Sequence, residues 1–139
     1  MKGPLTDKRI VLGVTGSIAC YKAVDLASKL VQRGALVDTI LSYGATQFVT
    51  PLTFRGITHR PVITDTFDAT SEFSVEHVAL AHSADLMVVV PATVHSIAKL
   101  ALGLADDPLT TTAIATTAPI LVAPAMDANM FDNPATQKN

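Results

Sequence analysis

The chain has 139 residues, enough for one domain with a single hydrophobic core, and a composition of 49% apolar and 16% charged residues excludes a disordered protein. A net charge of −2 gives no electrostatic basis for binding nucleic acid, and no apolar run is long enough to cross a bilayer. The polar start, MKGPLTDKR, lacks the apolar core of a secretory signal, and a single cysteine, Cys20, excludes an internal disulfide. We therefore expect one cytoplasmic domain over 1–139. Its high apolar and low charged content allows two interpretations, a well-filled core or a surface partly covered by other subunits.

Five short apolar runs predict strands. The first, RIVLGVT, is a nearly continuous stretch of aliphatic residues, which is typical of a strand buried on both faces. LMVVVPA has the same character and is the strongest of the five, whereas PVITDTF is weaker. The predicted strands cover 9–15, 35–42, 61–67, 86–92 and 118–126.

Helical spacing separates most of these strands. Residues 17–33 repeat apolar side chains at helical spacing, with Ile18 on the apolar face, and Gly34 stands where a helix-ending glycine is expected. The alternation of strands and helices predicts an open, mostly parallel sheet with helices on both faces. The other predictions are short helical turns over 45–58, broken at Pro51, a loop over 67–76, a helix over 93–105, a helix or turn over 107–117, and a loop over 127–139.

Four of the predicted strands end in turns rich in small and hydroxyl residues: TGSIA, SYGAT, PATVHS and PAMDANM. In an open parallel sheet the carboxyl ends of the strands meet at one edge, and ligands bind outside that edge. Small residues let a ligand approach the backbone, and hydroxyl groups supply hydrogen bonds. The four turns together therefore predict one ligand site.

The turn GVTGSIA allows two interpretations. It can be a tight strand-to-helix turn, or its backbone amides and Ser17 can bind an anion at the start of the helix. A dinucleotide site usually has an acidic residue at the end of the second strand to bind a ribose, but this chain has Ser42 there. The residues therefore favour a mononucleotide phosphate over a dinucleotide.

Other candidate residues are less specific. His77 follows a polar segment, and its surroundings in the sequence do not separate a catalytic base from a bystander. Met126 and Met130 either fill gaps in the core or form an apolar wall for a ring system, with Asp127 and Asn129 as polar anchors. No histidine or cysteine spacing is typical of a metal site, so we expect none.

Five segments, GVTGSIACYKA, FVTPLTF, VEHVALAHSADL, PATVHSIAKLALGLADD and APAMDANMFDNPATQKN, resemble one family in unbroken order from residue 8 to residue 139. This family is the flavoprotein domain of phosphopantothenoylcysteine decarboxylase, one of the homo-oligomeric flavin-containing cysteine decarboxylases. The resemblance implies a Rossmann-like or flavodoxin-like three-layer α/β sandwich, FMN as cofactor, and trimers that bury the flavin near a subunit boundary.

The resemblance also implies roles for particular residues. His77 would be the active-site base, and Asp127, with Asn129 and Met130, would bind the substrate and its carboxylate. The residues implied to bind FMN are Gly16, Ser17 and Ile18 in the phosphate turn, Ser42 beside it, Thr93 and Ser96 at the phosphate or flavin, and Ala125 and Met126 against the ring system.

The implied reaction is the oxidative decarboxylation of 4′-phosphopantothenoylcysteine to 4′-phosphopantetheine in coenzyme A biosynthesis. Alternatives are a peptidyl-cysteine decarboxylase, a flavin prenyltransferase, a flavin reductase, and a non-catalytic flavin-binding subunit.

The sequence departs from the family pattern in two places. The family has asparagine at the position of Asp127, and an ionised aspartate there would repel a substrate carboxylate unless it is protonated, acts only in positioning, or the substrate lies elsewhere. The family's later cysteine, carried on a mobile lid, has no counterpart up to Asn139, and Cys20 cannot replace it. Without the lid, we expect the reaction to stall at the oxidised enethiol.

Overall fold

A computed structural model of the chain describes residues 2–64 and 73–139, with side chains from Val78 onward in the second range. The described residues form a five-stranded sheet in the order β3-β2-β1-β4-β5, and every neighbouring pair of strands is parallel. The strands are β1 (Arg9–Val14), β2 (Leu36–Leu41), β3 (Val62–Ile63), β4 (Leu86–Ala92) and β5 (Ile120–Pro124). The helices are α1 (Cys20–Gln32), α2 (Pro51–Thr58), α3 (Phe73–Ser83), α4 (Val94–Leu102), α5 (Pro108–Ala115), α6 (Ala128–Asp132) and α7 (Pro134–Lys138), with a 3₁₀ turn, η1, at Ala45–Gln47.

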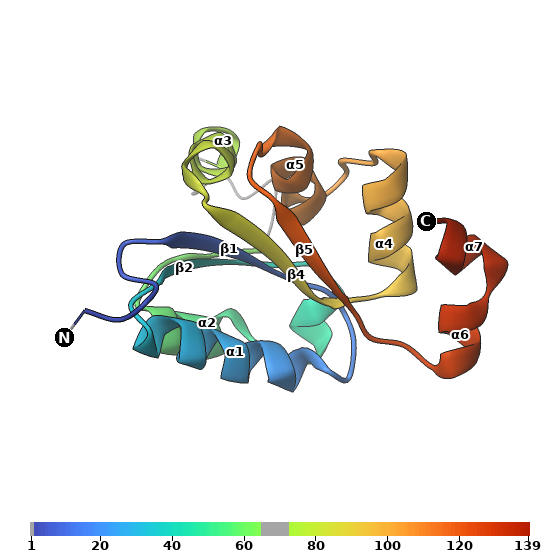
Figure 1. Cartoon of the computed structure of the whole chain (residues 1–139), viewed down its shortest axis with the longest axis horizontal. Helices are drawn as coiled ribbons and strands as arrows, with labels where there is room; N and C mark the ends of the chain where they lie inside the picture. The colour runs from blue at the N-terminus through green and yellow to red at the C-terminus, as the bar shows by residue number, and fades with distance from the viewer. Residues whose placement is uncertain (1, 65–72) are drawn as a thin grey trace.

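The sheet is the middle of three layers (Figure 1). Helices α1 and α2 cover one face, and α3, α4 and α5 cover the other. Side chains of β1 alternate between the faces: Leu12 packs against the α1 side, and Val11 packs against the α5 side. Both faces are therefore buried, which confirms the predicted three-layer α/β sandwich and explains why β1 is apolar from Ile10 to Val14.

The strand order reverses between β1 and β4. From β1 the chain builds outward through β2 to β3, then returns to the other side of β1 to form β4 and β5. Such a reversal leaves a crevice outside the carboxyl ends of the two central strands, because the connections leave them in opposite directions. The turns after β1 and β4 border this crevice.

The predicted end of α1 is confirmed, whereas the predicted effect of Pro51 needs correction. Gly34 follows α1 with φ of 98°, in the left-handed region that glycine adopts without strain. Pro51 begins α2 rather than interrupting a helix, because the first position of a helix needs no backbone donor.

Two predicted loops are wrong in part. The loop expected over 67–76 becomes α3 at Phe73, and the remainder, 67–72, lies outside the described residues. Apolar residues of α3 do not fall on a single stripe, so periodicity did not indicate a helix there. The loop expected over 127–139 contains α6 and α7, whose N-caps are the side chains of Asp127 and Asn133. In the described ranges, no helix is both long and apolar enough to span a membrane.

Candidate functional site

The four turns predicted to form a site lie along one edge of the sheet and are joined by hydrogen bonds. The amide of Ser42 donates to the carbonyl of Val14 at 3.0 Å, which joins the turn after β2 to the end of β1. The amide of Thr93 donates to the Thr15 hydroxyl at 3.1 Å, and the amide of Ala125 donates to the carbonyl of Ala92 at 3.1 Å. The parallel sheet therefore assembles the edge from residues far apart in the chain.

The turn after β1 makes a close backbone contact with the turn after β2. A Cβ atom on Gly16 would lie 2.8 Å from the Cα of Gly44, so no larger residue fits without moving one of the turns. Ile18 lies in the turn before α1 and is 83% exposed, so its predicted place on the buried face of a helix is wrong.

This turn presents unused hydrogen-bond donors. The amides of Gly16, Ser17 and Ile18 have no acceptor among the residues that the structure describes. The Ser17 hydroxyl accepts from the amide of Ala19 at 3.1 Å, and the Ser42 hydroxyl accepts from the amide of Ala45 at 3.2 Å. Each serine therefore has its own hydroxyl proton left to donate, and the donors suit an anion with several oxygens.

The turn after β4 is organised as the start of α4. Thr93 is the N-cap, and its hydroxyl accepts from the amide of Ser96 at 3.1 Å and donates to the Ser96 hydroxyl at 3.0 Å. Ser96 is buried, whereas His95 between them is exposed. The amides of Val94 and His95 have no acceptor within the described part of the chain, so a second set of donors faces the same edge.

A buried ion pair joins α4 to the start of α5. The Lys99 ammonium lies 2.5 Å from a carboxylate oxygen of Asp107 and 2.6 Å from one of Asp106, and its side chain is 10% exposed. Burial favours neutral Lys99, but the hydrogen bonds and charges of both aspartates outweigh it and raise the pKa of Lys99. Burial likewise opposes ionised Asp107, but hydrogen bonds from Lys99 and Thr110 lower the pKa of Asp107. Both groups are therefore charged at neutral pH.

The Cys20 thiol is not activated. It is buried at the start of α1 and donates to the carbonyl of Thr15 at 3.1 Å. Burial raises the pKa of the Cys20 thiol, partly offset by a hydrogen bond with the Ser17 backbone. A neutral thiol is a poor nucleophile and a weak acid, so Cys20 is a packing residue.

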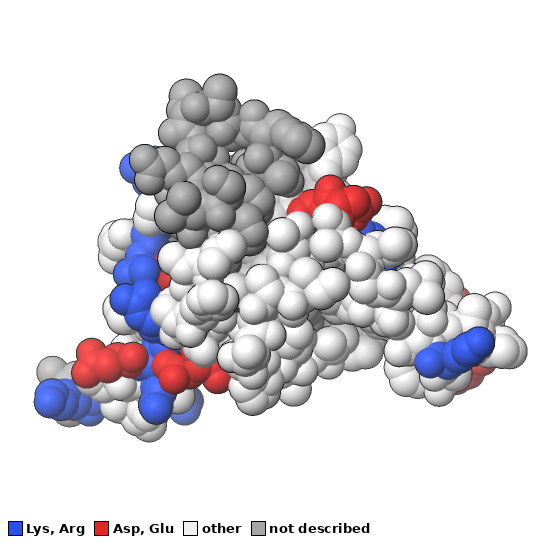
Figure 2. Space-filling view, turned by 90° about the horizontal axis from the view of Figure 1, so that it is seen from above, with Lys and Arg blue, Asp and Glu red and all other residues white. Residues whose placement is uncertain are grey.

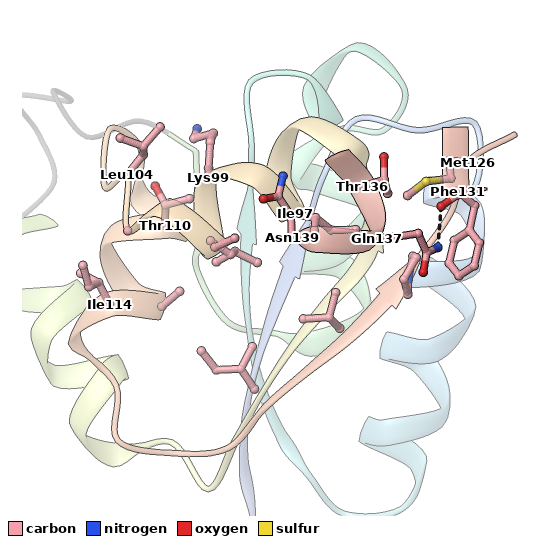
Figure 3. A pocket seen from close by; sticks show the side chains of 17 residues that line it. Ile97, Lys99, Leu104, Thr110, Ile114, Met126, Phe131, Thr136, Gln137 and Asn139 are labelled. Atoms are coloured by element: carbon pink, nitrogen blue, oxygen red, sulfur yellow. Dashed lines mark hydrogen bonds between the residues drawn. The ribbon is translucent and has the colours of Figure 1, made fainter. Parts of the chain in front are cut away.

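The segment after β5 extends beyond the three layers. Met126 lines an apolar cavity of about 670 Å³ between α4, β5 and α7, with Phe131 beside it (Figure 3). Ala125 is half-buried next to the turn after β4, whereas Asp127, Asn129 and Met130 are exposed around α6. The structure therefore joins Ala125 to the end of β4, whereas the three predicted substrate residues, in the later part of the fourth turn, are exposed around α6.

A family model described as Flavoprotein matches residues 1–139. The chain belongs to the flavoprotein family. This flavoprotein is 48% identical over 135 residues to the coenzyme A biosynthesis bifunctional protein CoaBC of Bacillus subtilis and 44% identical to that of Vibrio cholerae. Each alignment covers 97% of this chain, but the chain spans only about a third of the length of these curated relatives, 33% and 34%.

Two solved structures support the same family. The FMN-dependent cysteine decarboxylase SpaF superposes with a TM-score of 0.85 at 31% identity, over 96% of this chain and 77% of that chain. A PPC decarboxylase mutant, C175S, complexed with pantothenoylaminoethenethiol superposes with a TM-score of 0.78 at 27% identity, over 95% and 74%. These likenesses agree with the Rossmann-like arrangement of the sheet.

His77 of the flavoprotein lies in α3, but its side chain is outside the described part of the structure. The catalytic role of His77 therefore stays a prediction.

Two residues at the edge were missed by the sequence analysis. Thr15 is 1% exposed, and Gly44 meets Gly16 backbone to backbone. The sequence weakly indicated the role of Thr15, because it is a polar residue at the end of a predicted apolar strand. No sequence pattern indicated the contact between Gly44 and Gly16, because only the pairing of β1 with β2 brings the two glycines together.

Proposed function

We propose that this flavoprotein domain catalyses the FMN-dependent oxidative decarboxylation of 4′-phosphopantothenoylcysteine to 4′-phosphopantetheine in coenzyme A biosynthesis. The observation that carries the proposal is the group of amides at Gly16, Ser17 and Ile18, which have no acceptor among the described residues and lie at the reversal point of the sheet. This is the place and the chemistry for a mononucleotide phosphate. The names of the CoaBC relatives and of the PPC decarboxylase structure supply the substrate and the pathway.

The residues present fit FMN. The amides of the turn after β1 and the Ser17 and Ser42 hydroxyls would donate to the phosphate. Because Gly16 has no Cβ atom, the turns after β1 and β2 lie in backbone contact at Gly16 and Gly44, and donors of both turns would reach the same phosphate. Thr93 and Ser96 would line the phosphate or flavin side, and Ala125 would lie against the ring.

The chain's own residues would bind, orient and move a proton. FMN, when bound, supplies the two-electron oxidation of the cysteinyl group and the later return of those electrons. His77 would accept the proton lost from the substrate during this oxidation. The turns would fix the cofactor so that the cysteinyl group meets it in one orientation.

Asp127 would act in positioning. Its carboxylate accepts from the amide of Asn129 at 3.1 Å and caps α6. The side-chain oxygen of an asparagine makes the same cap, so the departure from the family pattern preserves this local structure. Asn129 and Met130, exposed on α6, would contact the substrate.

We further propose that the protein forms trimers and works in the cytoplasm. Large apolar side chains are exposed in two places, and the view in Figure 2 has few charged residues across its centre. Apolar surface of this kind is typical of subunit interfaces. The exposed residues are Ile18, Tyr21, Tyr43, Phe48 and Leu52 near the carboxyl edge, and Leu102, Leu104, Ile114, Leu121 and Phe131 around α4, α5, β5 and α6.

The deciding experiment combines FMN with 4′-phosphopantothenoylcysteine and measures carbon dioxide and the oxidised enethiol. The wild-type chain should bind FMN, turn yellow and release carbon dioxide. His77→Asn should keep the yellow colour and lose the release, whereas His59→Asn, on the exposed end of α2, should keep both. A chain that binds FMN and leaves the substrate unchanged would instead be a non-catalytic flavin-binding subunit.

A peptide ending in cysteine is the second candidate substrate, as the peptidyl-cysteine decarboxylase alternative of the sequence analysis implies, and the likeness to the FMN-dependent cysteine decarboxylase SpaF fits a substrate other than 4′-phosphopantothenoylcysteine. Both substrates should be compared at equal concentration. Faster carbon dioxide release from the peptide would replace the coenzyme A assignment while leaving the flavin chemistry intact.

A further inference from the structure

Thr15 lies where the two central strands of the sheet end. It follows β1, is 1% exposed, and is separated by 76 residues from the carbonyl to which its hydroxyl donates. That carbonyl belongs to Pro91 in β4, and the Thr15 amide donates to the same oxygen at 3.3 Å. The backbone and side chain of Thr15 therefore both bind the end of β4.

The same hydroxyl is also an acceptor. It accepts from the amide of Thr93 at 3.1 Å, and Thr93 is the N-cap of α4. One buried hydroxyl thus joins the last residues of β4 to the residue that begins α4. It also lies directly before Gly16, the first of three residues whose amides have no acceptor in the part of the chain that the structure describes.

We propose that Thr15 is a positioning residue for the phosphate site: its hydroxyl sets the spacing between the amides of the Gly16–Ile18 turn and the first turn of α4. The inference rests on the proposed function, because it takes the phosphate of FMN as the ligand of these donors. Thr15 itself does not contact the ligand. Thr15 acts through Thr93: without the Thr15 hydroxyl, the Thr93 amide would lose its acceptor, and the N-cap of α4 would no longer be held against the end of β1.

A hydroxyl is required because the two bonds need a donor and an acceptor on one atom. Valine has the same shape as threonine but would leave the Thr93 amide and the Pro91 carbonyl each without a bond to Thr15 Oγ1. Serine would retain both bonds.

Thr112 offers a matched control. It is also fully buried, and its hydroxyl donates to another proline carbonyl, that of Pro108, at 2.7 Å. Both of these atoms lie within α5, away from the four turns. Thr112→Val therefore removes an equivalent buried hydroxyl without touching the proposed spacing.

The test titrates the apoprotein with FMN and with riboflavin, which lacks the phosphate, and follows the flavin fluorescence. Thr15→Val should weaken FMN binding by about tenfold and riboflavin binding by much less, because the loss acts on the phosphate donors. Thr15→Ser should bind FMN within about twofold of wild type, and Thr112→Val should unfold more easily but keep its FMN affinity.

Three results would overturn the inference: equal FMN affinity in wild type and Thr15→Val, equal losses for FMN and riboflavin, or a loss in Thr112→Val as large as that in Thr15→Val. If Thr15→Val does not fold, Thr15→Cys, with a weaker donor and acceptor, should still lower FMN affinity selectively, and its failure to do so would also overturn the inference. A wild-type chain that binds no FMN would instead overturn the proposed function, and this inference with it.

Discussion

A Cβ atom built on Gly16 would lie 2.7 Å from the carbonyl carbon of Gly44. Both atoms belong to backbone, so no side-chain rotation can relieve such a contact. The turn after β1 therefore keeps its shape only because residue 16 has no side chain.

Gly16→Ala should push the two turns apart. We expect a loss of about 1–3 kcal/mol in the free energy of unfolding, measured in urea, together with weaker FMN binding. The control is Gly56→Ala in α2, where a Cβ atom meets nothing within 4 Å; this change should stabilise the protein by about 0.5–1 kcal/mol. Unchanged FMN affinity in Gly16→Ala would argue against a phosphate in this turn.

Lys99→Met should be strongly destabilising. It removes the cation that partners Asp107 at the start of α5, and we expect a loss of about 2–3 kcal/mol because Asp107 is only partly exposed to water. Lys29→Met is the matched change at an exposed pair, Lys29–Asp25, and should cost less than about 0.5 kcal/mol. Equal losses in the two variants, measured by urea unfolding, would show that the Lys99 pair behaves as a surface pair.

The contribution of Asp107 should depend on pH in the acid range. The pKa of Asp107 is lowered in the folded state, so near this pKa the folded protein binds fewer protons than the unfolded chain. The stabilisation from Asp107 is therefore complete above the pKa of an aspartate in the unfolded chain, about 3.9. This stabilisation is lost as the pH falls through the lower pKa that Asp107 has in the folded protein. The difference in melting temperature between wild type and Asp107→Asn should therefore shrink from about pH 5 to about pH 3.

The contribution of Lys99 to stability has the opposite dependence on pH. Its folded-state pKa is raised, so its contribution is complete below the unfolded value of about 10.4 and is lost as the pH rises through the folded value. Between these limits the difference between wild type and Asp107→Asn should be constant. If the difference in melting temperature between wild type and Asp107→Asn grew on acidification, it would contradict the lowered pKa of Asp107.

Gly13→Ala should reveal how closely α5 packs on β1. A Cβ atom there would lie 2.9 Å from Cδ1 of Leu109, a fully buried side chain, and the overpacking should cost about 1–3 kcal/mol. Leu109→Ala alone should cost about 2–5 kcal/mol by leaving a cavity. The double variant should lose less than the sum, because the new methyl group partly fills that cavity. Strict additivity in the urea-unfolding cycle would mean that the two residues do not share this space.

Much of the fold could be predicted because its signals are local. The apolar run LMVVVPA coincides with β4, and Gly34 ends α1 as expected, since burial of a strand and the end of a helix depend on neighbouring residues. Helix α3 and the C-terminal helices were missed because their patterns are weak. Asp127 and Asn133 are ordinary N-cap residues, but each precedes a helix of only five residues, too short to show a period.

For the candidate site, the sequence by itself determined which turns carry small residues and hydroxyl groups, because each turn is a short continuous segment, whereas the structure showed which amides lack an acceptor among the described residues. Only the tertiary structure decided that Gly16 meets Gly44, that Thr15 reaches Pro91 and Thr93, and that Lys99 is buried against Asp107. Most of these contacts join residues that are distant in sequence, and parallel strands bring them together at one edge. The local sequence determines which chemical groups these residues carry, but the order of the strands decides which residues they contact.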